Sequence, residues 1–188
     1  MGAMTVLSSV MQFAMLPLQG LGQGAQPIIS YNYGAKNAER VKKAFRLLLT
    51  ASLCYSVTLW ALVMAVPQAF VMMFNTNEAL VSYTIPALRI YLGALLLFGI
   101  QVACQMTFTS MGNALASVIV AVVRKFVLLL PLIYIMPLIF TADKATAVFM
   151  AEPVADTIAV LFTAILFFFQ FRRFMSKMNA ADKEKTNT

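Results

Sequence analysis

The sequence predicts an all-α integral membrane protein, an antiparallel bundle of five transmembrane helices. Of its 188 residues, 61% are hydrophobic and 11% are charged, whereas soluble domains average about 45–50% and about 25%. Three uncharged runs, 1–35, 47–77 and 90–123, each exceed the roughly 20 residues that a helix needs to cross the hydrocarbon core. Two shorter apolar runs, 126–142 and 157–171, also reach that length once their flanks are included.

These runs divide the chain into a transmembrane bundle over residues 1–173 and a cytoplasmic tail over 174–188, which ends in charged and small residues. The connections between the apolar runs are short, so consecutive helices must pack as antiparallel neighbours. We place the five spans at about 4–33, 45–74, 80–109, 116–139 and 147–172.

The basic residues predict the orientation of the bundle. Five of them separate the first two spans, two lie near the start of the fourth, and five follow the fifth. They are Lys36, Arg40, Lys42, Lys43, Arg46, Arg124, Lys125, Arg172, Arg173, Lys177, Lys183 and Lys185. The opposite loops carry only Lys144, and Arg89 lies within the third span. Because cytoplasmic loops are rich in Lys and Arg, we expect the 34–46 loop and the C-terminus to be cytoplasmic.

Several classes of function are disfavoured. The net charge of +7 is explained by membrane orientation, so a nucleic-acid partner is not expected. The chain has no histidine, and its two cysteines are isolated, which argues against a zinc site or a Cys–His nucleophile. No nucleophile–base set or phosphate loop is visible, so we do not expect an enzyme.

The N-terminus is predicted to lie outside, because five spans end in the cytoplasm. The first residues lack the basic region and small-residue cleavage site of a signal peptide. An odd number of spans that begins outside predicts that a further N-terminal part belongs to this protein.

Polar residues in the first span fall on one side of the predicted helix. At 100° per residue they share a sector about 60° wide, and they are Gln12, Gln19, Gln23, Gln26 and Ser30. A polar stripe at membrane depth is costly, so we expect it to face the bundle interior. It could supply interhelical hydrogen bonds or line a solvated, ligand-binding wall, and the excess of glutamine favours the wall.

The same span contains helix-breaking residues. Pro17 and Pro27 each remove a backbone donor and clash with the preceding turn. Gly20, Gly22 and Gly24 lie between them. We therefore expect this helix to bend at the prolines, as helices that line transporter cavities do.

Two further polar pairs lie on later spans. Gln101 and Gln105 are four residues apart in the third span, and so are Glu152 and Asp156 in the fifth. Carboxylates in a membrane need a cation, a proton or a basic partner. The alternatives are a cation or proton site at Glu152 and Asp156, or a structural ion pair between Arg89 and Asp156, which lie at similar predicted depths.

One stretch closely resembles a known transporter family. Residues 17–46, PLQGLGQGAQPIISYNYGAKNAERVKKAFR, are similar to the helix and cytoplasmic loop that begin the second half of multidrug and toxic compound extrusion (MATE) transporters. The matching features are the glycine-rich QG-x-QP helix and the Y-N-Y-G-A-K segment with its later Arg40 and Val41. Residues 108–137 and 151–159 also resemble the family, in its bacterial multidrug-exporter branch.

The resemblance implies a twelve-helix antiporter of the bacterial cytoplasmic (inner) membrane. Its five spans would correspond to helices eight to twelve, most of one six-helix lobe. Such a protein would export cationic organic compounds in exchange for Na⁺ or H⁺, with no other cofactor. Its partners would be membrane lipid, the cationic substrates and the missing N-terminal lobe.

The resemblance also implies roles for the polar residues. Gln23, Gln26, Gln101 and Gln105 would line the central cavity and bind substrate. Glu152 and Asp156 would couple a cation or proton, and the bend at Pro27 would assist alternating access. Two alternatives stay open: a lipid-linked oligosaccharide flippase of the same superfamily, which would need cationic cavity residues, and a non-transporting half that pairs with a separate N-terminal lobe.

Overall fold

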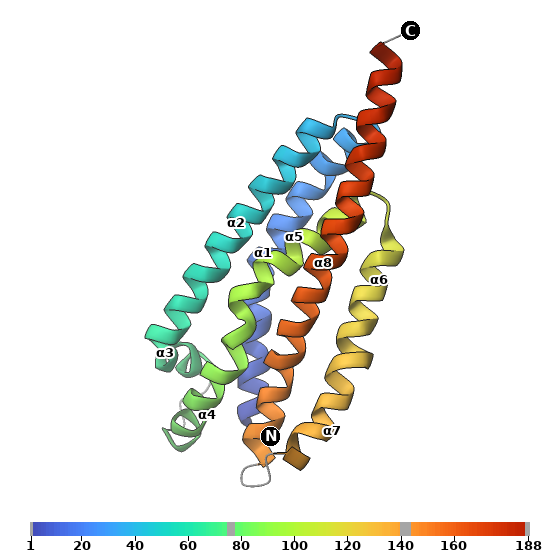
Figure 1. Ribbon diagram of the computed structural model, residues 1–188. Coiled ribbons are helices and arrows are strands. Elements are labelled where there is room, and N and C mark those ends of the chain that lie inside the picture. The colour runs from blue at the N-terminus through green and yellow to red at the C-terminus, as the bar shows by residue number, and fades with distance from the viewer. Residues whose placement is uncertain (1, 75–77, 140–143, 187–188) are drawn as a thin grey trace.

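The computed structural model describes residues 2–74, 78–139 and 144–186, and within these residues every regular element is a helix (Figure 1). The elements are α1 (Gly2–Gly34), α2 (Ala38–Ala65), α3 (Pro67–Met72), α4 (Glu78–Tyr91), η1 (Leu92–Ala94), α5 (Leu95–Ser110), α6 (Ala114–Val122), η2 (Val123–Leu129), α7 (Leu130–Ile139) and α8 (Lys144–Thr186). Five segments are long and apolar enough to cross a membrane. The predicted fold class, an all-α membrane bundle, is confirmed. The two loops that the sequence predicts to be outside, near residues 75–79 and 141–145, lie mostly beyond the described residues.

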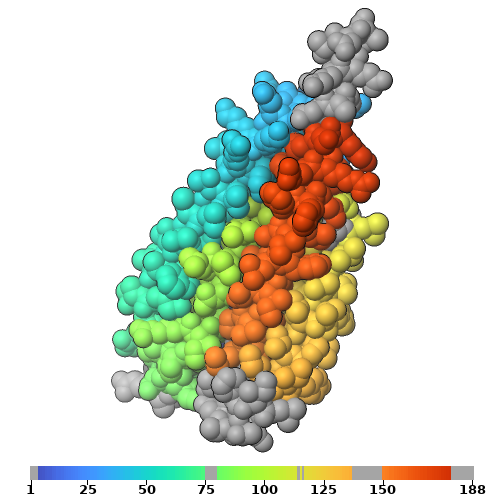
Figure 2. Space-filling model, viewed as in Figure 1, coloured from blue at the N-terminus to red at the C-terminus, as the bar shows by residue number. Residues whose placement is uncertain are grey.

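Helix α5 forms the centre of the bundle. It packs against α1, α2 and α8, and α2 and α6–α7 lie at opposite edges of the molecule (Figure 1 and Figure 2). In the third span, Leu80–Ser110, 67% of the apolar 18-residue stretch is buried inside the bundle, whereas in the fourth, Ser117–Met136, the buried share is 6%. The fourth span is therefore an edge helix whose surface is largely uncovered by the described residues.

The core consists of two hydrophobic clusters stacked along the bundle. The first lies toward the end with the N-terminus and includes the fully buried Leu7, Leu88 and Phe98. The second lies toward the α1–α2 turn, where the Phe167 ring stacks on Phe45 at 4.7 Å and on Phe171 at 4.9 Å between ring centroids. Both clusters draw side chains from α1, α2, α5 and α8, so these four helices form one packed unit.

The second span ends earlier than the sequence predicts. Helix α2 stops at Ala65, and α3 begins at Pro67 with a change of direction at Val66, whose φ and ψ are −132° and 59°. A proline disfavours helical backbone in the residue before it, which explains the break. The apolar run to residue 77 thus contains a span and a separate short helix.

The fifth span continues beyond its predicted end at residue 172. Helix α8 extends to Thr186 and projects past the other helices at the end of the bundle that carries the α1–α2 turn (Figure 1). Met175 and Met178 are 4% and 6% exposed and belong to the second core cluster. Packing therefore continues past residue 173, where the sequence predicts the tail to begin.

The α1–α2 turn supports a prediction about stability. Lys36 has a left-handed backbone, with φ at 59°. The next residue, Asn37, caps α2 by accepting a hydrogen bond from the Arg40 amide at 3.0 Å. Because glycine adopts this backbone without a Cβ penalty, Lys36→Gly should raise the free energy of unfolding by about 0.5–1 kcal/mol. Lys36→Ala loses the same charge but keeps the Cβ, so it should not stabilise; detergent unfolding of both variants provides the comparison.

Candidate functional site

The glutamine stripe of α1 faces outward from the described bundle. Gln12, Gln19, Gln23 and Ser30 are exposed and Gln26 is half-buried, whereas Leu7, Leu18 and Ile29, about 100–140° round the helix from Gln12, are fully buried. The expectation that the stripe faces the interior of these five spans is therefore wrong. The packed face of α1 is its apolar one, which buries more hydrocarbon, and the amides are left on an open surface.

The other pair of glutamines lies on α5, in different surroundings. Gln101 is 4% exposed, and its Oε1 has no hydrogen-bond partner among the described residues. Gln105 is half-buried, and its Nε2 donates to the Ser117 hydroxyl on the edge helix at 3.2 Å. The four predicted substrate-binding amides thus fall into two groups, one exposed on α1 and one within the bundle.

The prolines of α1 do not interrupt its helix. The element runs unbroken from Gly2 to Gly34 through both Pro17 and Pro27. Both prolines are exposed. The carbonyls of Phe13 and Gln23, which lose their helical hydrogen bonds to these prolines, therefore lie on the exposed side of the helix. A bend at these positions stays a prediction.

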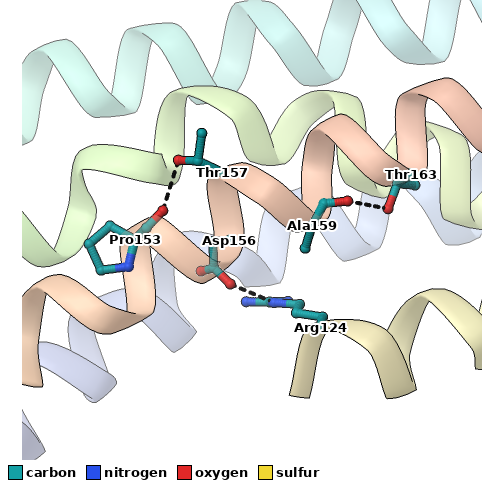
Figure 3. A network of polar contacts seen from close by, with 6 residues as sticks. All are labelled: Arg124, Pro153, Asp156, Thr157, Ala159 and Thr163. Carbon is teal, nitrogen blue, oxygen red and sulfur yellow. Dashed lines mark hydrogen bonds and ion pairs between the residues drawn. The ribbon is translucent and has the colours of Figure 1, made fainter. Parts of the chain in front are cut away.

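An ion pair in the middle of the bundle joins the edge helix to α8. The Arg124 Nε donates to the Asp156 Oδ1 at 2.6 Å, and the two side chains are 21% and 3% exposed (Figure 3). The same guanidinium lies 5.2 Å from the centroid of the Phe98 ring on α5. The charge of Arg124 is therefore held between a carboxylate and an aromatic face.

This ion pair corrects the predicted pairing of Asp156 with Arg89. Arg89 is exposed on α4, and the residue beside Asp156 is Arg124. Arg124 and Lys125 are predicted near the start of the fourth span, on its cytoplasmic side. Because helix α6 begins at Ala114, Arg124 lies about 15 Å along the helix that α6 and η2 form, at the depth of Asp156. The basic residues that support the predicted orientation therefore number ten rather than twelve, since these two lie at mid-span.

The backbone around Arg124 is unusual. Residues Val123–Leu129 form a π-helix between α6 and α7. A π-helical turn contains an extra residue and occurs frequently at functional sites. Lys125, the next residue, is exposed at the centre of the span. A lysine about 17 Å from one end of its helix and about 21 Å from the other is costly in hydrocarbon, so this surface needs water or a polar partner.

Glu152 lies one helical turn before Asp156 on α8 and has different neighbours. The buried Tyr91 side chain has Glu152 and Ser8 of α1 as neighbours. Tyr91 ends α4, immediately before the 3₁₀ turn η1. Three helices thus meet at this carboxylate, which has no ion pair with a described basic residue.

The remaining hydroxyls of α8 near this site are satisfied by their own helix. Thr157 donates to the Pro153 carbonyl at 2.8 Å, and Thr163 to the Ala159 carbonyl at 2.7 Å (Figure 3). Asp156 Oδ2, by contrast, is buried without a partner among the described residues. Among these polar groups of α8, the unsatisfied atom is therefore a carboxylate oxygen.

Sequence reasoning identified both carboxylates but missed Arg124, Tyr91 and Ser8. A signal for Arg124 was present: it follows the Gly112–Asn113 turn by about eleven residues, which is three helical turns. Tyr91 and Ser8 gave no such signal, because a tyrosine or serine in an apolar span is ordinarily a packing residue.

Comparison with known proteins gives consistent matches. The family model MatE matches residues 1–135. The "Multidrug export protein MepA" of Staphylococcus aureus is 26% identical over 70% of this chain and 29% of its own length. The protein of the same name from Staphylococcus haemolyticus is 23% identical over 87% of the chain and 35% of its own length.

Solved structures share the fold. "Crystal structure of MATE in the bent conformation" aligns with a TM-score of 0.85 at 15% identity, over 94% of this chain and 39% of that one. A MOP superfamily transporter from Pyrococcus furiosus, described as having a binding pocket of reverse polarity that suggests a different function, aligns with a TM-score of 0.83 at 16% identity, over 92% of this chain and 38% of that one.

The chain spans about a third of the length of these relatives. Its five apolar helices make it a multi-pass membrane protein. Because the family model covers more than two thirds of its 188 residues, the chain belongs to the MATE family of membrane transport proteins.

Proposed function

We propose that this chain forms part of a secondary multidrug efflux antiporter that exports cationic organic compounds in exchange for Na⁺ or H⁺. The observation that carries the proposal is the outward glutamine face of α1. It occurs in a chain of which 70% is similar to MepA. An exposed amide surface at membrane depth requires water or a partner. In this proposal it is one wall of a substrate cavity.

The opposite wall would come from the N-terminal lobe of the transporter. Two described surfaces require a cover in hydrocarbon: the glutamine stripe of α1 and the face of the edge helix with Lys125. A lobe supplied by the same or a separate polypeptide would cover them. The proposed setting is the bacterial inner membrane with the C-terminus in the cytoplasm, which agrees with ten basic residues on one side.

We assign ion coupling to Glu152. Asp156 is engaged by Arg124 at 2.6 Å, and its role is to hold the edge helix. Glu152, with Tyr91 and Ser8, offers a carboxylate and two hydroxyls from three helices. That set of oxygens suits Na⁺, and the carboxylate could take up H⁺ instead.

Efflux by a chimera tests the proposal. This chain replaces the matched segment of S. aureus MepA in a strain without its own multidrug exporters, and loss of ethidium fluorescence from loaded cells is followed. Gln26→Ala should raise the KM about three- to tenfold, the equivalent of one hydrogen bond. Glu152→Gln should weaken binding of the coupling ion about ten- to a hundredfold, because the charged acceptor is lost. The concentration of that ion needed for half-maximal efflux should rise by the same factor.

Matched controls make the same chemical changes elsewhere. Gln68→Ala on α3 and Glu39→Gln at the start of α2 alter exposed residues outside the proposed site and should leave efflux unchanged. Unchanged efflux in both Gln26→Ala and Glu152→Gln, with the chimera active, would exclude these site assignments.

A flippase for a lipid-linked oligosaccharide is the second candidate, and Lys125 favours it. An exposed cation at mid-span is suited to an anionic phosphate and repels a cationic drug. Lys125→Gln separates the two functions in the same chimera. If the protein is a drug exporter, the Lys125→Gln variant should retain or increase ethidium efflux. If it is a flippase, the same variant should lose translocation of a fluorescent lipid-linked phosphate.

A further inference from the structure

A groove between α1 and α2 lies outside the proposed transport site. Its volume is about 670 Å³, and its walls are almost entirely apolar. Gly20 and Gly24 of α1 face Ala44 and Ala51 of α2 across it, and a Cβ added at either glycine would meet no atom within 4 Å. Small side chains on both helices thus keep this space open.

The groove occupies its own face of α1. Gly24 lies about 120° round the helix from the glutamine stripe at Gln12, and the fully buried Leu18 lies on the third face. The groove is therefore separate from the predicted cavity wall, and the core residue Leu48 contributes to its lining.

The depth of the groove matches one leaflet of a bilayer. Its α2 wall runs from Ala44 to Tyr55, a rise of about 16 Å, and half of the hydrocarbon core is about 15 Å. Tyr55 closes the inner end, where its hydroxyl donates to the Ala14 carbonyl at 3.2 Å. The other end opens toward the α1–α2 turn at Lys36 and Asn37.

Positive charge lies at that open end. Arg40 is one turn before Ala44 on the same face of α2, Lys43 flanks it, and both are exposed. Tyr31, one turn beyond the groove on α1, is 76% exposed, as aromatic residues at membrane interfaces often are. The acidic Glu39 lies about 140° round α2 from Ala44 but only one turn before Lys43. Arg40 is therefore the cation in line with the groove, and Lys43, with Glu39 beside it, adds charge at its flank.

We propose that this groove binds an acyl chain of an anionic phospholipid, whose phosphate contacts Arg40 and Lys43. An apolar slot one leaflet deep with a cationic mouth complements both parts of such a lipid. A further transmembrane helix fits less well: a cylinder about 10 Å wide over the same 16 Å occupies roughly twice the volume of the groove. The lipid would stabilise the α1–α2 pair beside the glutamine stripe.

Photocrosslinking of the full chain in lipid nanodiscs tests the proposal. The discs contain phosphatidylcholine with a trace of either phosphatidylglycerol or phosphatidylcholine that carries a diazirine in one acyl chain, and labelled peptides are identified by mass spectrometry. We expect phosphatidylglycerol to label residues 17–28 and 44–55 at least threefold more than the phosphatidylcholine probe does. Other lipid-facing segments should label equally with both probes.

Two variants address the two parts of the site. Gly24→Leu fills the groove and should abolish its labelling by both probes. Arg40→Gln should reduce the ratio of phosphatidylglycerol labelling to phosphatidylcholine labelling in the groove to about one. Gly93→Leu, at another glycine with open space around its Cβ, and Arg46→Gln, on the opposite face of α2, are the matched controls. Circular dichroism confirms that each variant keeps its helices.

Three outcomes would overturn the proposal. Equal labelling of the groove by both probes in the unaltered chain would exclude recognition of the anionic headgroup. An unlabelled groove beside labelled neighbouring spans would mean that protein covers it. Retained labelling in the folded Gly24→Leu variant would place the acyl chain elsewhere.

Discussion

Replacing Asp156 with alanine is expected to lower the free energy of unfolding by about 3–5 kcal/mol, the cost of leaving one partner of a buried ion pair uncompensated. Arg124 loses its 2.6 Å contact with Asp156 and stays about 15 Å along its span, too deep for its side chain to reach the interface. The Phe98 ring, 5.2 Å away, offsets only a small part of this loss. Unfolding in mixed micelles titrated with sodium dodecyl sulfate, followed by circular dichroism, measures the change.

A double-mutant cycle identifies the origin of the loss. Arg124→Met should destabilise to a similar extent, because it leaves Asp156 buried and charged. Arg124→Met combined with Asp156→Leu removes both charges and should recover stability to within about 1–2 kcal/mol of the unaltered chain. Arg89→Met tests the pairing predicted from sequence and should change stability by less than about 0.5 kcal/mol. Additive losses in the double variant would show that Arg124 and Asp156 are not coupled.

The five spans could be predicted from sequence because the bilayer imposes one simple requirement. A segment of about 20 apolar residues must form a helix, since no water is present to satisfy its backbone. This requirement determines that a span exists and approximately where it is centred. It does not determine the ends, which depend on local breaks such as Pro67 and on packing such as that of Met175 and Met178.

The candidate site was only partly predictable for a related reason. Helical periodicity placed Glu152 and Asp156 on one face of the fifth span. It also placed the glutamines of the first span on one face of α1. It did not indicate which face other helices would cover, so the glutamine stripe was expected inside and lies outside. The partner of Asp156 depended on the depth of Arg124, which falls inside the predicted span 116–139 but was counted among the basic residues of its cytoplasmic end.

The contact between α2 and α5 at Gly99 should be the most sensitive packing position in the core. A Cβ added there would lie 2.6 Å from the Ser52 carbonyl oxygen and 2.5 Å from the Ser56 Oγ. Small residues of this kind allow transmembrane helices to approach closely. Gly99→Ala should therefore destabilise by about 1–3 kcal/mol, the usual cost of overpacking, even though alanine is the better helix former.

The sign of the effect distinguishes close packing from helix propensity. Gly20→Ala adds the same methyl group to a helix where nothing lies within 4 Å, so it should gain up to about 1 kcal/mol from propensity alone. Ser56→Ala should rescue Gly99→Ala only in part, because it removes the hydroxyl and leaves the Ser52 carbonyl, which is backbone and cannot move away without shifting α2. Equal stability of Gly99→Ala and Gly20→Ala in the detergent titration would mean that α2 and α5 are further apart than the structure places them. Full rescue by Ser56→Ala would mean instead that the hydroxyl, and not the backbone, sets the limit on their approach.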